Sequence, residues 1–402
     1  MKKNKKIAGD LIYSIGAIAL MNMVLQFIVY PLMNRTLGTD GFGDMLFWIG
    51  LVSVFAPSFG LAVNNVRLVF VQRERTQNGD YNKILLLFSI VSCFILIGIG
   101  IGQKISVISA IMLSYIMVFS IFRNYSTVEY RLNLNYKRQF IFYSILSLGY
   151  ILGGICSWKL KEWFLVFIIG ETLSVLYVKY RGNIYKDFFH TSEYANEIAK
   201  RCATLSAAYL MTNTMLNLDR FVLKFCIGES AVSEYYVLSL IGKTIAIIGG
   251  PLSSVIIGYI SKDKYKINRK QFQKIVAFML VGGVVFWLAA SVVTPIFIHI
   301  FYPTLTQRSV VLNLVVNAAQ IIYFLTNLLL VVVLTLCSEK WQFVIQLTYT
   351  ISFLILSIGL TLSFGLIGFA TAALVANSIY MLFTIIIGIN KSAGNKNSVD
   401  IR

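Results

Sequence analysis

The stretch LIYSIGAIALMNMVLQFIVYPLM, residues 11–33, carries no charged residue over a length that matches the hydrocarbon core of a bilayer. A helix rises about 1.5 Å per residue, so about 20 apolar residues cross about 30 Å of hydrocarbon. Similar runs recur along the whole chain, which is only 13% charged, whereas soluble domains average about 25% charged residues. The sequence therefore predicts an all-α polytopic membrane protein and excludes a single soluble core.

Twelve membrane-spanning helices are predicted from these runs. Two pairs of spans are separated only by short turns, at Gly102-Gln103-Lys104 and at Phe364-Gly365. The expected ranges are 11–33, 44–64, 84–102, 105–122, 139–156, 163–179, 203–226, 235–259, 274–299, 309–336, 343–362 and 366–389.

The polar stretch 180–201 follows the sixth span and divides the chain into two domains, 1–190 and 191–402. Each half begins alike, because NRTLGTDGFG follows the first span and FCIGESAVSEYY follows the seventh, and each leads into another span. The second span of each half carries a proline, Pro57 or Pro251. Internal repeats of this kind are common in transporters, so we expect two bundles of six helices.

The net charge of +18 comes from lysines and arginines that concentrate in alternate loops. Short cytoplasmic loops carry such positive charge, so both termini are expected in the cytoplasm, and the basic composition indicates topology rather than a nucleic-acid partner. The start MKKNKK precedes an apolar run with no small-residue cleavage site. We interpret that run as a retained first span and not as a signal peptide.

The sequence offers no catalytic or metal-binding constellation. Its five cysteines are scattered singly, its two histidines lie far apart, and no GxxxxGK[ST] stretch occurs. We therefore expect no catalytic residue, no metal and no cofactor. If the protein is a transporter, the energy would come from a proton or sodium gradient, or from later reactions that consume the transported molecule.

Three stretches carry a resemblance to a known family: VYPLMNRTLGTDGFGD (29–44), FGLAVNNVR (59–67) and LDRFVLKFCIGESAVSEYY (218–236). They resemble the Wzx-type flippases of the multidrug/oligosaccharidyl-lipid/polysaccharide (MOP) exporter superfamily. The resemblance implies a MATE-like fold of two six-helix bundles around a central cavity, often lined by cations. It also implies a bacterial inner-membrane flippase for an undecaprenyl-pyrophosphate-linked O-antigen or similar repeat unit, with a polysaccharide polymerase and a chain-length regulator as partners.

Lys243 lies inside the predicted span 235–259, roughly 12 Å from its outer end at 1.5 Å per residue. A charge facing lipid at such depth costs roughly 2.5–3.5 kcal/mol, so the side chain should face protein or water. Residues at spacings of three and four share its helix face and are small or polar: Tyr236, Ser239, Ala246 and Gly250. We predict that Lys243 reaches the anionic head group of a substrate.

Other spans carry comparable polar stripes, which suggests a shared wet interior that binds sugar hydroxyls and phosphate. The predicted binding residues are Lys243, Arg220, Arg67, Lys224, Asn213, Asn217, Asn317 and Gln320. Other interpretations stay open. The amides could join helices to one another, Arg67 could mark the cytoplasmic end of its span, and Arg220 and Lys224 could reach the outer interface.

Two acidic residues are candidates for ion coupling. Glu171 lies near the middle of the span 163–179, and Asp219 sits beside Arg220. A carboxyl group in a low dielectric binds protons more readily, which suits reversible protonation. The alternative for each is a structural ion pair or a hydrogen-bonded group.

Two other functions are candidates for the whole protein. The second candidate is a multidrug antiporter of the same superfamily, and the third is a polysaccharide polymerase.

Overall fold

The computed structural model describes residues 2–70, 76–247, 268–305, 310–334 and 339–394. No β-strand occurs among these residues, which confirms the all-α prediction. Seven helical stretches within them are long and apolar enough to cross a membrane. The chain divides into two compact units, Met1–Phe221 and Val222–Arg402.

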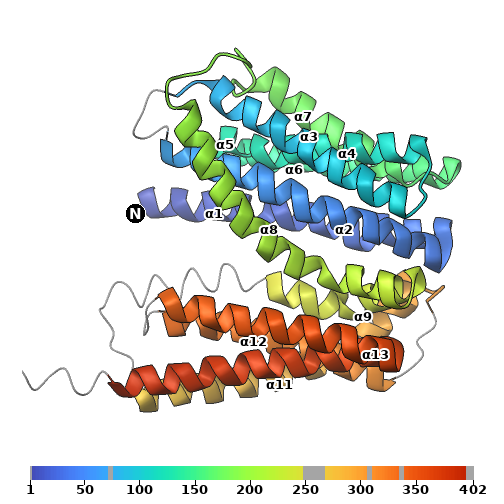
Figure 1. The fold of residues 1–402 in the computed structure, drawn as a ribbon, viewed down its shortest axis with the longest axis vertical. Helices are drawn as coiled ribbons and strands as arrows, with labels where there is room; N and C mark the ends of the chain where they lie inside the picture. Colours follow the sequence, from blue (N-terminus) through green and yellow to red (C-terminus); the bar gives the residue numbers. More distant parts are fainter. Residues whose placement is uncertain (1, 71–75, 248–267, 306–309, 335–338, 395–402) are drawn as a thin grey trace, which may run out of the picture. The chain divides into compact units, whose positions relative to one another are not determined.

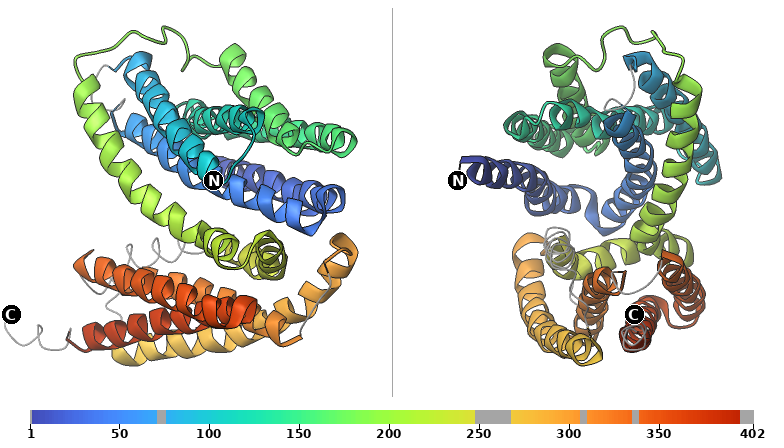
Figure 2. Two further views of the ribbon diagram at one scale, coloured as in Figure 1. Left: turned by 45° about the vertical axis from the view of Figure 1, so that its right-hand side comes forward. Right: turned by 90° about the vertical axis from the view of Figure 1, so that its left-hand side faces the viewer.

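The first unit holds the helices coloured blue to green in Figures 1 and 2, where α8 (Ala195–Cys226) crosses the others obliquely. They are α1 (Lys2–Met23), the π-helical stretch η1 (Val24–Val29), α2 (Tyr30–Phe70), α3 (Asn78–Gly102), α4 (Val107–Ser126), α5 (Val128–Leu132), α6 (Tyr136–Leu160), α7 (Phe164–Arg181) and the larger part of α8.

The predicted turn between the third and fourth spans is confirmed. Helix α3 ends at Gly102, and Lys104 takes a left-handed conformation with φ of 56°. Helix α4 then begins with an N-cap, because the Ser106 side chain accepts a hydrogen bond from the Ser109 backbone N–H at 3.0 Å.

Spans one and two are joined more tightly than the sequence suggested. Residues 30–70 form one helical stretch, interrupted at Gly38 with φ of 74° and ψ of −179°. Only glycine adopts this backbone conformation without strain. A single residue therefore breaks the helix where NRTLGTDGFG was expected to connect two spans.

Glycines let α6 and α7 approach each other closely. A Cβ atom on Gly149 would lie 2.6 Å from the Gly170 Cα, and one on Gly153 would lie 2.6 Å from the Leu165 carbonyl oxygen. Contacts of this kind, between small residues, are how helices pack inside membranes, where the hydrophobic effect cannot hold them together.

The segment between α7 and α8 is fastened to the first unit by carboxylates. The two carboxylate oxygens of Asp80 accept hydrogen bonds from the backbone N–H and the hydroxyl of Ser192, both at 2.7 Å. Glu129 accepts from the backbone N–H groups of Asn183 and Ile184 at 3.1 and 3.2 Å. The polar stretch that divides the sequence is thus an ordered part of this unit.

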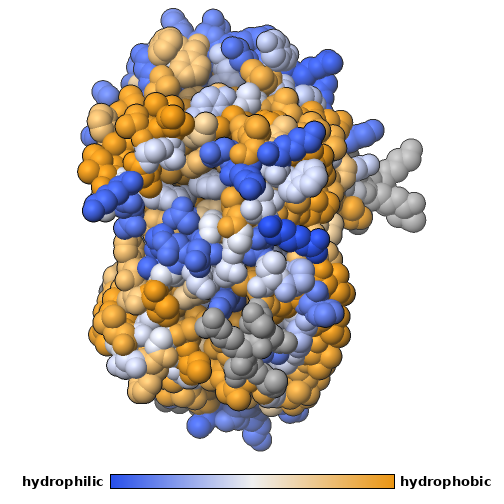
Figure 3. Space-filling view, turned by 90° about the vertical axis from the view of Figure 1, so that its right-hand side faces the viewer, coloured by the Kyte–Doolittle hydropathy of each residue, from blue (hydrophilic) through white to orange (hydrophobic). Residues whose placement is uncertain are grey.

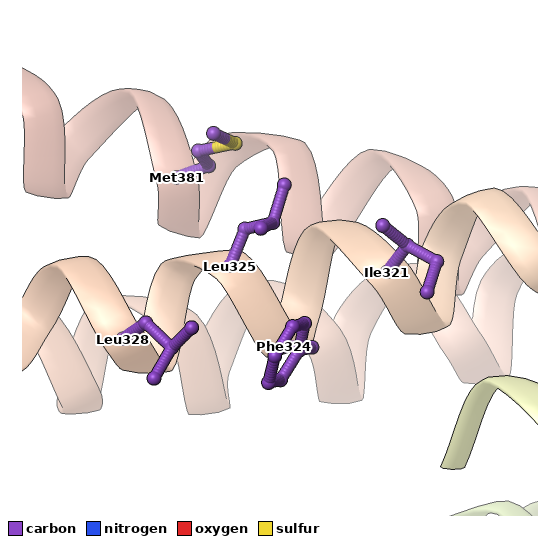
Figure 4. Close-up of a cluster of buried hydrophobic side chains, with 5 residues drawn as sticks. All are labelled: Ile321, Phe324, Leu325, Leu328 and Met381. Atoms are coloured by element: carbon purple, nitrogen blue, oxygen red, sulfur yellow. The ribbon is translucent and has the colours of Figure 1, made fainter. Parts of the chain in front are cut away.

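The second unit contains the end of α8, then α9 (Glu229–Ile247), α11 (Arg269–Phe301), α12 (Val310–Leu334) and α13 (Glu339–Gly394). Gly365, with φ of 61° and ψ of −140°, interrupts α13 at the predicted turn between spans eleven and twelve. Helices α12 and α13 share an apolar core, drawn in Figure 4, of Ile321, Phe324, Leu325, Leu328 and Met381.

The outer surface of the helices is unusually apolar for a protein in water. Large hydrophobic side chains such as Phe94, Ile101 and Phe278 are 71%, 74% and 81% exposed. Figure 3 shows that apolar side chains gather in broad patches on the face it displays. A surface of this kind is suited to hydrocarbon.

Helix α8 belongs to the first unit through Phe221, although the sequence places it at the start of the second half. Compact units follow packing and not sequence repeats. The domains 1–190 and 191–402 therefore stay a prediction, and Pro251, which supports the repeat, lies outside the described residues.

Candidate substrate-binding residues

Arg67, in the last turn of α2, is bonded to the neighbouring helices α3 and α4. Its Nη1 donates to the Tyr125 hydroxyl, and its Nη2 donates to the Asn78 side-chain oxygen at 2.6 Å. The guanidinium carbon also lies 4.9 Å from the centre of the Tyr81 ring, within the range of a cation–π contact. These contacts join three helices at one end of the first unit.

Helix α8 presents its predicted polar face to α2. The Asn213 side chain donates to the Ser58 hydroxyl at 2.9 Å. The Asn217 side chain, one turn further along, donates back to the Asn213 carbonyl at 2.9 Å. The two amides therefore lie on one face of α8, as their spacing predicted.

Arg220 and Asp219 occupy the next turn of α8. The Arg220 Nη1 donates to the Leu46 carbonyl of α2 at 3.3 Å, and the Asp219 carboxylate accepts from the Arg220 backbone N–H at 3.0 Å. Gly50 makes room for this arginine, because a Cβ atom there would lie 3.0 Å from the Arg220 Cδ. Arg220 thus lies along α2 within the first unit.

Lys224 forms an ion pair with Glu229 across the short turn between α8 and α9. The hydrogen bond from Lys224 lowers the pKa of the Glu229 carboxyl below its usual value. The Glu229 side chain is 42% exposed, so water screens this pair and its contribution to stability is small.

Lys243 lies among polar and aromatic groups of the second unit. Its Nζ is 5.9 Å from the centre of the Tyr235 ring, and the Tyr235 hydroxyl accepts from the Gln320 side chain at 3.4 Å. Gly242 allows the close approach of α12, because a Cβ atom there would meet the Gln320 Cβ at 2.6 Å and the Asn317 Oδ1 at 3.4 Å. The structure thus groups Lys243, Gln320 and Asn317, three of the predicted residues, where α9 meets α12.

Asn317 is fully buried and also extends a hydrogen-bonded chain to α11. Its side-chain nitrogen donates to the Asn313 side-chain oxygen at 2.7 Å and to the Thr294 hydroxyl at 3.2 Å. Asn313 in turn donates to the Ser291 carbonyl at 2.8 Å. The asparagine stripe of α12 therefore joins helices, which is one of the two interpretations that the sequence left open.

Glu171 of α7 is 2% exposed and forms an ion pair with Arg123 of α4, with 2.6 Å between the Arg123 Nε and the carboxylate. Its other carboxylate oxygen accepts from the Tyr150 hydroxyl of α6 at 2.9 Å. Three helices of the first unit thus meet at one carboxylate. Its role in ion coupling stays a prediction.

Sequence reasoning missed Arg123, which lies just beyond the predicted span 105–122. A basic residue at the end of a span looks like a topology signal, and nothing in the sequence indicates that its side chain turns back to a carboxylate. It also missed a network in which the Arg131 Nη1 donates to the side-chain oxygens of Asn64 and Asn65, at 2.7 and 2.8 Å.

The predicted binding residues and Asp219 divide between the two units, but the contacts do not bring each set together at one point. Arg67 is bonded in the last turn of α2, whereas Arg220 lies beside Leu46, far from that end of the helix. Arg67, Asn213, Asn217, Asp219 and Arg220 lie in the first unit, and Lys224, Lys243, Asn317 and Gln320 lie in the second. Each set consists mainly of cations and amides, which bind phosphate oxygens and sugar hydroxyls. The central cavity that would join them stays a prediction, and Gly250 of the Lys243 stripe lies outside the described residues.

Comparison with known proteins identifies the fold. No protein-family model matches the chain, and neither does any curated protein sequence. Among solved structures, the lipid II flippase MurJ matches with a TM-score of 0.63 at 18% identity, over 94% of this chain and 87% of MurJ. A multidrug resistance MATE family transporter of the MOP superfamily matches with a TM-score of 0.62 at 13% identity, over 94% and 96% of the two chains.

This chain has the fold of MATE transporters and MurJ. A MATE transporter from Vibrio cholerae also matches, with a TM-score of 0.56 at 13% identity over 96% of each chain. The fold and the apolar helices together make this a multi-pass membrane protein. At such low identity the likeness concerns the fold and carries no information on the substrate.

Proposed function

We propose that the protein is a flippase that moves an undecaprenyl-pyrophosphate-linked oligosaccharide from the cytoplasmic to the outer leaflet. Its twelve spans would form two six-helix bundles that alternate access to a cavity between them, in the inner membrane of a bacterium with both termini in the cytoplasm. Fold likeness to transporters and to one lipid flippase supports transport over enzymatic activity. The Wzx-type motifs support an O-antigen or similar repeat unit as the cargo.

The observation that carries the proposal is the surroundings of Lys243. Lys243, inside the predicted span 235–259, lies 5.9 Å from the centre of the Tyr235 ring, and the Tyr235 hydroxyl accepts a hydrogen bond from the Gln320 amide of α12. Cations bind phosphate, and amides and hydroxyls bind sugar hydroxyls. This combination of groups is the one that an anionic, sugar-bearing head group would contact.

A multidrug antiporter is the second candidate, because MATE family transporters share the fold. Cationic drugs would need acidic groups to bind them. The buried carboxylate of Glu171 is already paired with Arg123, and Lys243 adds a positive charge. This balance favours an anionic cargo.

Energy coupling is part of the proposal. Without a P-loop in the sequence, a proton or sodium gradient would act through Glu171 or Asp219. The two access states must differ in their affinity for the coupled ion, because a ligand shifts an equilibrium only through such a difference. Glu171 already has two bonded partners, so a change in this triad would accompany coupling.

Display of surface polysaccharide tests the proposal. In a deletion strain, Lys243→Ala should lower display at least tenfold at unchanged protein level, whereas Lys270→Ala, which removes an exposed lysine of the same unit, should not change it. Normal display by the Lys243 variant would contradict the binding role. Export of cationic dyes by the wild-type protein, together with normal polysaccharide in the deletion strain, would favour the antiporter instead.

A further inference from the structure

Among the described residues, Arg131, on the short helix α5, is held by two amides and by no carboxylate. Its Nη1 donates to the side-chain oxygens of Asn64 and Asn65 at 2.7 and 2.8 Å. Within the part of the chain that the structure describes, its Nε and Nη2 have no hydrogen-bond partner. Neither nitrogen is among the fully buried polar atoms that lack a partner. A guanidinium group has five N–H donors, so most of its donors stay available.

The orientation of the Asn65 amide determines what Tyr209 of α8 can do. Arg131 can only donate, so the side-chain oxygen of Asn65 must face it. The amide nitrogen then faces Tyr209 and donates to its hydroxyl at 2.7 Å. The Tyr209 oxygen is therefore an acceptor in this bond, and its own hydrogen points to no described residue. Tyr209 is thus a second available donor, at the other end of the same amide.

The orientation of the Asn64 amide is determined in the same way, with its oxygen facing Arg131. The Asn64 side-chain nitrogen donates to the Thr127 hydroxyl at 2.7 Å and to the Tyr125 carbonyl at 3.2 Å, which leaves its oxygen for Arg131. Asn64 is fully buried, so it holds Arg131 rigidly against the end of α2. Arg131 and Tyr209 are therefore held in place and have N–H and O–H donors with no acceptor among the described residues.

Arg67, only three residues from Asn64, contrasts with Arg131. Both of its Nη atoms have partners, Tyr125 and Asn78, and its Nε is buried without one. Its charge adds to the positive potential at this end of the first unit, but its donors cannot reach a ligand without breaking those bonds. The sequence singled out Arg67 for binding, whereas the structure leaves Arg131 better placed.

We propose that Arg131 and the Tyr209 hydroxyl form a phosphate-binding site for the pyrophosphate of the lipid-linked cargo. Phosphate oxygens only accept hydrogen bonds, and arginine binds them in pairs, so they complement two donors held by locked amides. The site lies at the end of the first unit that is predicted to face the cytoplasm, where the cargo is loaded. This inference rests on the flippase function and adds the residues that receive the head group.

Binding of inorganic pyrophosphate to the full-length protein in phosphatidylcholine nanodiscs tests the site. We expect Arg131→Gln to weaken binding about tenfold or more, since it removes the charge-assisted hydrogen bonds to the phosphate oxygens. Tyr209→Phe should weaken it about threefold to tenfold without disturbing packing. Arg131→Lys keeps the charge but loses the two parallel N–H donors of the guanidinium group. Its affinity for pyrophosphate should lie between those of the wild-type protein and Arg131→Gln.

Arg138→Gln is the matched control, because Arg138 is an exposed arginine at the same end of the unit. It should bind pyrophosphate as the wild-type protein does. Equal losses in the Arg131 and Arg138 variants would mean surface charge alone, and unchanged binding in Arg131→Gln and Tyr209→Phe would mean no site. Either result overturns the inference.

Competition identifies the source of the phosphate. Undecaprenyl pyrophosphate in the nanodisc should displace inorganic pyrophosphate, and phosphatidylglycerol should not; equal displacement by both would overturn the assignment to the cargo. The two proposals also fail separately. If Lys243→Ala abolishes display while Arg131→Gln binds normally, the site fails and the flippase stands. If the protein moves no lipid-linked cargo while binding of the probe still depends on Arg131, the flippase fails and the site stands.

Discussion

At the scale of single residues, the most consequential contact is the ion pair of Glu171 and Arg123. The Glu171 side chain is 2% exposed and the Arg123 side chain 14%. Two charges removed from water repay their desolvation only through close mutual contact and further hydrogen bonds. Tyr150 supplies one such bond, so each member of the triad depends on the others.

Glu171→Gln should destabilise the protein by about 3–5 kcal/mol, because it leaves the Arg123 charge buried without a counter-charge. The double variant Glu171→Gln/Arg123→Gln should recover most of that loss, since it removes both charges together. Thermal unfolding of the four proteins in a double-mutant cycle measures the coupling. Additive effects of the two substitutions would contradict a direct pair.

The same double variant separates a structural role from coupling. If Glu171 carries the coupled ion, the stable double variant should transport without its normal dependence on pH or sodium. Transport by this variant with unchanged dependence on both ions would assign coupling elsewhere and leave Glu171 as a structural residue.

At the scale of elements, glycines decide where the long helices break. Gly365 takes φ of 61° and ψ of −140° inside α13, a conformation that costs other residues about 1–3 kcal/mol. Gly365→Ala should destabilise the protein by that amount. Gly359→Ala is the control, because Gly359 lies in the same helix and a Cβ atom there has no atom within 4 Å. It should be neutral or stabilising by up to about 1 kcal/mol. Chemical denaturation measures both, and equal effects would argue against a backbone requirement at Gly365.

The contact between α6 and α7 depends on a different property of glycine, its small volume. Gly153→Ala places a Cβ atom 2.6 Å from the Val166 Cα and from the Leu165 carbonyl oxygen, so the helices must separate, at a cost of about 1–3 kcal/mol. Gly98→Ala in α3 adds the same atom where nothing lies within 4 Å. Thermal unfolding should therefore distinguish the two variants, and a Gly153 variant as stable as the Gly98 variant would show that the interface can relax.

At the scale of the whole molecule, the alternating distribution of lysine and arginine sets the expected topology. The net charge of +18 concentrates in loops on one side of the predicted spans, and positively charged short loops stay in the cytoplasm. A green fluorescent protein fused after residue 402 should therefore be fluorescent, and an alkaline phosphatase fused there should be inactive. The same reporters fused after Gly102, at the end of α3, should give the opposite result. A phosphatase active at both positions would contradict the predicted topology.

Much of the element-level structure followed from the sequence. The break after Gly102 and the turn at Gly365 coincide with their predicted positions, because apolar length and glycine conformation act over a few neighbouring residues. The helical faces were also predictable, since Asn213 and Asn217 lie on one face of α8 as their spacing requires. The continuous helical stretch on both sides of Gly38 was not predictable. The sequence suggested a connection of ten residues, whereas the single residue Gly38 interrupts the helix.

The residues of the candidate site were predictable from the sequence only in part. Hydropathy marked Lys243 and Glu171 as unusual, since a charge in an apolar segment is visible in the sequence alone. Their partners were not visible: Arg123 lies 48 residues from Glu171, Asn65 lies 66 residues from Arg131, and Tyr209 lies 144 residues from Asn65. The class of protein and its helices are local properties of composition and period. Which donors are used up and which stay available depends on segments that meet only when the chain folds, so the tertiary structure alone separated Arg131 from Arg67.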